Sequence, residues 1–137
     1  MNQHIYLRAY MAGIVVPTIF LLIVATVFTV ARYIYNVPVP VERVIVFPMA
    51  VVPNAWGLWN VLFVALRSRL QLSIGLHGAL LPILLAPLGI VVTSLLNFPI
   101  PSFAVHAFPI AAPVALILYY LAWKYLVGFL NRVQDIV

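Results

Sequence analysis

The chain has 137 residues, of which 66% are hydrophobic and 7% are charged, with a net charge of +5 and no cysteine. A soluble domain carries charge on about a quarter of its residues, so this chain lacks the polar residues to cover a soluble fold. We therefore expect an all-α integral membrane protein. The missing cysteines exclude disulfides, thiol catalysis and cysteine-bound metals.

Four segments are apolar over the roughly 20 residues that a helix needs to cross the hydrocarbon layer. They are residues 9–33, 41–66, 72–96 and 103–129. The first segment is longer than the apolar part of a signal peptide and is followed by a poor cleavage site, so we interpret it as a retained span. The sequence predicts a single four-span domain over residues 1–137, with several spans kinked by internal prolines.

The basic residues predict the orientation in the membrane. Five lie on the side of the two termini: Arg8, Arg67, Arg69, Lys124 and Arg132. Only Arg32 and Arg43 lie on the other side, and this asymmetry favours both termini inside the cell. The basic residues are scattered and form no nucleic-acid-binding face. Short loops and the lack of cysteine point to a prokaryotic inner membrane.

Residues 36–48 align without gaps to residues 97–109, pairing Asn36 with Asn97, and both stretches begin with the pattern N-x-P-x-P. This repeat predicts two parallel helical hairpins, residues 9–66 and 72–129, related by a twofold axis along the membrane normal. The alternative is convergence, because asparagine and proline commonly end one helix and begin the next.

Polar side chains inside predicted spans are the candidate functional residues, because they are costly to place in lipid. The candidate cluster consists of Asn54, Asn60, His77 and Lys124. Counting from the inner boundaries puts Asn60, His77 and Lys124 at similar depth in the inner leaflet. The alternative is structural: Asn60 and His77 hydrogen-bond across their hairpin, while Lys124 extends to the headgroups.

The inventory of reactive groups is small. The two carboxylates, Glu42 and Asp135, lie near the ends of the spans, and the three histidines lack the spacing of metal ligands. We therefore expect no enzyme, catalytic residue, metal or cofactor. The chain is similar in length to small multidrug carriers but lacks their membrane-embedded glutamate in its first span.

Two functions remain open at this level. The first is a small homo-oligomeric channel or transporter for a small solute, lined by Asn54, Asn60 and His77. Four spans enclose little on their own, so this function requires several copies in the bilayer. The second is a non-catalytic scaffold, or a subunit that binds a lipid or a membrane partner.

Overall fold

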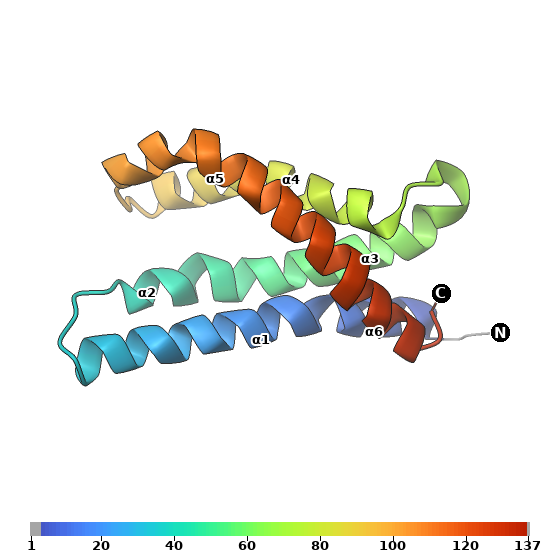
Figure 1. Cartoon of the computed structure of the whole chain (residues 1–137), viewed down its shortest axis with the longest axis horizontal. Helices are drawn as coiled ribbons and strands as arrows, with labels where there is room; N and C mark the ends of the chain where they lie inside the picture. The colour runs from blue at the N-terminus through green and yellow to red at the C-terminus, as the bar shows by residue number, and fades with distance from the viewer. Residues whose placement is uncertain (1–3, 137) are drawn as a thin grey trace.

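The structure, a computed structural model, describes residues 4–136 apart from the side chains at positions 46 and 47. Its regular elements are all helical (Figure 1). The α-helices are α1 (Ile5–Tyr33), α2 (Val41–Val44), α3 (Ala50–Leu70), α4 (Ile74–Leu95), α5 (Ser102–Leu121) and α6 (Gly128–Val133). Two π-helical segments join some of them: η1 (Ile45–Met49) connects α2 to α3, and η2 (Ala122–Val127) connects α5 to α6.

Three helical stretches are long and apolar enough to cross a membrane: Ile5–Tyr33, Ile74–Leu95 and Ser102–Val133. The second predicted span, residues 41–66, is instead divided among α2, η1 and α3. Pro48 lies in η1 and has no N–H to donate, which suits a local change of helical register. Helix α3 also ends with Arg67 and Arg69 in its last turn, so it is less apolar than the other three.

The helices form two hairpins, α1 with α2–α3 and α4 with α5, and both close at the same end of the molecule (Figure 1). We call this the closed end. The described chain ends and the link between α3 and α4 lie at the opposite, terminal end. The two hairpins thus point the same way (Figure 1). Asn36 and Asn97 share a left-handed φ of 54° just beyond α1 and α4, a conformation that asparagine tolerates well.

Helices α1 and α3 pack closely because glycines face each other. A Cβ added at Gly13 would lie 2.6 Å from the carbonyl oxygen of Trp56 and 2.8 Å from the Cα of Gly57. Small residues at such a contact let two membrane helices approach backbone to backbone. The contact at Gly13 and Gly57 therefore sets how closely α1 and α3 approach each other in the first hairpin.

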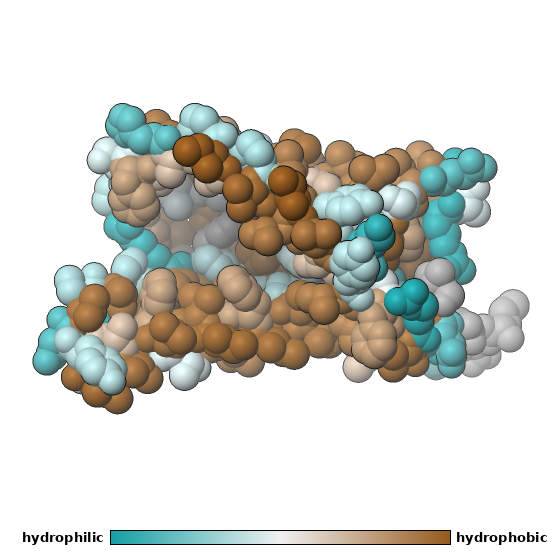
Figure 2. All heavy atoms as spheres, in the orientation of Figure 1, coloured by the Kyte–Doolittle hydropathy of each residue, from teal (hydrophilic) through white to brown (hydrophobic). Residues whose placement is uncertain are grey.

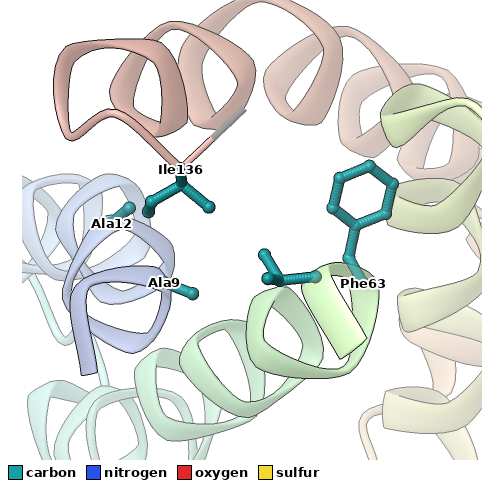
Figure 3. Close-up of a cluster of buried hydrophobic side chains, with 5 residues drawn as sticks. Ala9, Ala12, Phe63 and Ile136 are labelled. Atoms are coloured by element: carbon teal, nitrogen blue, oxygen red, sulfur yellow. The ribbon is translucent and has the colours of Figure 1, made fainter. Parts of the chain in front are cut away.

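The core lies toward the terminal end. From the closed end, α5 continues through η2 into α6, which crosses over to the first hairpin (Figure 1). This crossing brings Ile136 against Ala9, Ala12, Phe63 and Val64 in one apolar cluster (Figure 3). A second cluster, toward the middle of the molecule, contains Trp56, Leu81, Leu85, Trp123 and Val127.

The closed end is packed far less. None of the residues of α5 is buried, and the buried residues of α4 stop at Leu85. Figure 2 shows apolar side chains over most of the middle of the visible face, hydrophilic ones gathered mainly toward both ends, and a hollow between the hairpins near the closed end. Much of the apolar surface of the second hairpin therefore has no protein neighbour within the described chain.

Candidate functional site

Asn60 is completely buried between three segments of the chain. Its Nδ2 donates to the carbonyl oxygen of Ala9 in α1 at 2.7 Å and to Oδ1 of Asn131 in α6 at 2.8 Å. Nδ2 of Asn131 donates in return to Oδ1 of Asn60 at 3.0 Å. Both amide hydrogens of Asn60 and its carbonyl oxygen are thus engaged inside the protein.

His77 is almost completely buried, with 4% of its surface exposed, and it is held by Trp59. Its Nε2 lies 2.9 Å from the carbonyl oxygen of Trp59, and Nε1 of Trp59 donates to the carbonyl oxygen of His77 at 2.7 Å. Because a carbonyl only accepts, Nε2 carries the hydrogen. The two rings stack with centroids 4.7 Å apart and planes 22° apart. This reciprocal pair fastens α3 to the start of α4.

The surroundings of His77 are aromatic, and the space beside it is small. Phe63 and Trp123 lie against its ring, with centroids at 5.3 Å and 5.9 Å. Gly78 makes room for Trp123, since a Cβ on Gly78 would overlap the indole ring. The cavity beside His77 has a volume of about 10 Å³. That volume is at the lower limit for one water molecule, so no solute fits there.

Asn54 and Lys124 lie apart from this buried group. Asn54 is exposed; its Oδ1 accepts from the hydroxyl of Tyr10, and its Nδ2 donates to the carbonyl oxygen of Ala50 at 2.9 Å. Lys124 is exposed as well, with its Nζ 5.7 Å and 5.3 Å from the ring centroids of Tyr120 and Tyr125. Of the four candidates, only Asn60 and His77 are buried, and each bonds to a different partner.

Three residues that form hydrogen bonds at the terminal end were not among the candidate site residues predicted from the sequence. Asn131 is the amide partner of Asn60, and it lies beyond residue 129, where we expected the fourth span to end. Arg8 and Arg67 donate to the carbonyl oxygens of Gln134 and Ile136, each at 2.8 Å, and so satisfy acceptors that follow α6. The only sequence signal for Asn131 is a neutral amide among the apolar residues that precede Arg132.

Trp123 is the most deeply buried of the aromatic side chains that the structure describes. Its side chain is fully buried, and its Nε1 is the one buried side-chain polar atom among the described residues that lacks a hydrogen-bond partner. The indole of Trp56 lies beside it, with centroids 5.3 Å apart. The ring therefore contributes packing to the core, and its N–H faces aromatic or apolar surroundings.

Open spaces much larger than this one lie along α4 and α5. One cavity of about 480 Å³ and one of about 510 Å³ are lined by both helices and share Ala86, Ile90 and Phe108. A third, of about 240 Å³, shares Thr93 and Ile100 with the second and reaches Arg43 of α2. We call the three together the α4–α5 groove. Its lining is apolar except at Thr93 and Arg43.

Within residues 4–136 no three histidine or carboxylate side chains come close enough together to hold a metal ion. Comparison with protein-family models, curated proteins and solved structures finds no match to this chain. The geometry itself is that of an all-helical protein in which three helices are long and apolar enough to span a membrane.

Proposed function

We propose that the chain is a four-span integral membrane protein that acts as a non-catalytic binding subunit and does not conduct solutes by itself. Three spans are the long apolar helices, and the fourth is α2–η1–α3, which runs beside α1 over the length of the first hairpin (Figure 1). The excess of basic residues at the terminal end favours that end as cytoplasmic. The short loops favour a prokaryotic inner membrane.

One observation carries this proposal: the polar groups and the open space of the molecule are in different places. Asn60 and His77 use their hydrogen-bonding groups inside the protein. The α4–α5 groove, which is open, is apolar along most of its length. A solute pathway needs polar groups facing the space through which the solute moves. An apolar groove suits a hydrophobic ligand.

A non-catalytic function also agrees with the placement of the acidic groups. Glu42 is paired with Arg32 near the closed end, whereas Asp135 lies near the terminal end. The two carboxylates therefore stand at opposite ends of the molecule and cannot act on one substrate. General acid–base catalysis by a carboxylate pair has no basis in this arrangement.

A homo-oligomeric channel or transporter is the second candidate, and one observation favours it. Helix α5 has no buried residue, so much of its surface is open to contact with another copy. A polar pathway would then have to form between copies, with exposed Asn54 as its best-placed polar side chain. The two candidates differ in whether solute crosses the bilayer.

The deciding experiment uses the full chain in phospholipid vesicles. We expect the efflux of potassium and of glycerol to equal that of protein-free vesicles, and native mass spectrometry of the purified protein to find retained lipid. Efflux that rises with protein content and falls in Asn54→Leu would overturn the binding function and establish the transport function. Asn60→Leu is an unsuitable variant for this test, because it removes internal hydrogen bonds.

A further inference from the structure

The α4–α5 groove is continuous, because successive cavities share lining residues. The cavity nearest the middle of the molecule is bounded by Pro82 and Leu116 and shares Ala86 with the next. That second cavity shares Thr93 with the outermost one, which ends at Arg43. The groove thus leads from the middle of the apolar zone to the closed end. This polarity profile, apolar along the groove and charged at its end, matches that of a lipid whose headgroup lies at the surface.

The closed end of the groove carries an uncompensated positive charge. Glu42 is the only carboxylate near it, and Glu42 is paired with Arg32. Arg43 is exposed, and its guanidinium forms no ion pair or hydrogen bond with any residue that the structure describes. A guanidinium matches the geometry of a phosphate better than that of any neutral headgroup.

One further feature of this end suits an anion. Helix α5 begins at Ser102, directly after Pro101, which lines the outermost cavity. The start of a helix presents partial positive charge. The positive groups therefore meet at the same end of the groove.

From this arrangement we infer that the α4–α5 groove binds a phospholipid, with the phosphate at Arg43 and an acyl chain along α4 and α5. The inference rests on the proposed binding function and specifies its ligand class. Beneath the headgroup the lining contains only apolar side chains and Thr93, so the lipid chain is recognised by burial of its methylene groups. The phosphate contact provides the selectivity.

The test compares two lipids with identical acyl chains, phosphatidylglycerol and diacylglycerol, which differ in the phosphate headgroup. Each is offered to the detergent-purified full chain, and bound lipid is counted by native mass spectrometry. We expect the wild type to retain phosphatidylglycerol over diacylglycerol by about tenfold, in line with a charge-assisted hydrogen bond. Arg43→Gln should remove this preference, whereas Arg69→Gln, an equal loss of charge at the terminal end, should keep it.

A second pair of variants tests the acyl-chain path. Ala86→Phe fills the groove where two cavities meet and should abolish retention of both lipids. Ala65→Phe, at an exposed alanine of α3, should leave retention unchanged. The thermal unfolding temperature of each variant is measured as well. A variant that loses lipid but unfolds at the wild-type temperature has lost the binding path and not the fold.

The outcomes separate the inference from the proposed function. Equal retention of both lipids by the wild type and by Arg43→Gln would overturn the phosphate site and leave the binding function standing. Retention of neither lipid would overturn both. Loss of a dimer in Ala86→Phe, without a change in bound lipid, would overturn the inference and identify a second copy as the occupant of the groove.

Discussion

Asn60 and Asn131 exchange two amide hydrogen bonds although 71 residues separate them along the chain. The pair joins α3 to α6, and the additional bond from Asn60 to Ala9 joins both to α1. Three segments thus meet at one buried amide. An amide in an apolar interior is stabilising only while its partners are present, and it becomes costly when one is removed.

The first prediction concerns this amide pair and His77. Asn60→Leu and Asn131→Leu should each lower the free energy of unfolding by about 1–3 kcal/mol, because each leaves a buried amide unpaired. The double variant should cost less than the sum of the two, since both amides are then gone. Equilibrium unfolding in mixed micelles, followed by tryptophan fluorescence, measures all three changes.

His77 supplies the matched comparison. His77→Leu breaks its bond to the carbonyl oxygen of Trp59, and no hydrogen bond links His77 to Asn60. The costs of His77→Leu and Asn60→Leu should therefore add to within about 0.5 kcal/mol. Strong non-additivity between these two substitutions would contradict the separation of their partners.

The second prediction concerns the contact between Gly78 and Trp123. Gly78→Ala should destabilise the protein by about 1–3 kcal/mol, because its methyl group overlaps the buried indole ring. Gly128→Ala is the control: its Cβ would lie 3.4 Å from the nearest neighbouring atom, an ordinary contact, so the cost should be near zero or reversed by better helix propensity. Thermal unfolding in detergent distinguishes the two, and equal costs would argue against the close packing of α4 on η2.

The third prediction concerns the two matching asparagines. Asn36→Ala and Asn97→Ala should each cost about 1 kcal/mol, because alanine is strained at a φ of 54°. Asn36→Gly and Asn97→Gly should be tolerated, because glycine adopts this conformation freely. Chemical unfolding of the four variants provides the measurement. A different ranking at the two positions would mean that the two loops do not share one conformation.

The fourth prediction concerns the segment after α6. Ile136→Ala should lower the free energy of unfolding by about 2 kcal/mol, because this side chain is 3% exposed and fills the cluster formed with α1 and α3 (Figure 3). The control is Val133→Ala, at a side chain that is 62% exposed, and it should change stability by less than about 0.5 kcal/mol. Hydrogen exchange of residues 130–136 should rise in the first variant only.

The sequence predicted the helical class and three of the spans as long apolar helices. Those features follow from hydropathy, which acts locally. Depth counting grouped Asn60, His77 and Lys124, and the structure finds the first two buried and the third exposed. Depth counting could not predict the direction in which each side chain faces around its helix.

Lys124 illustrates this limit. Its predicted depth matched that of Asn60, but it lies on an exposed face within η2. A π-helical segment changes the angular position of every later residue, and no pattern in the sequence announced η2. Asn131, seven positions after Lys124, also follows the start of η2, so the same change in angular position applies to it. The division of the second predicted span at η1 has a related cause, since Pro48 was expected to bend a helix and not to change its type.

The crossing of α6 over the first hairpin also has a consequence for how the protein is made. Asn60 belongs to α3, yet its amide partner belongs to a segment synthesised 71 residues later. Until that segment has been made, Asn60 has its bond to Ala9 within the first hairpin but lacks both bonds to Asn131. Docking of residues 128–136 is therefore the step that completes the core at the terminal end. A ribosome stalled before this stretch should leave a membrane-inserted but loosely assembled intermediate that quality-control proteases can recognise.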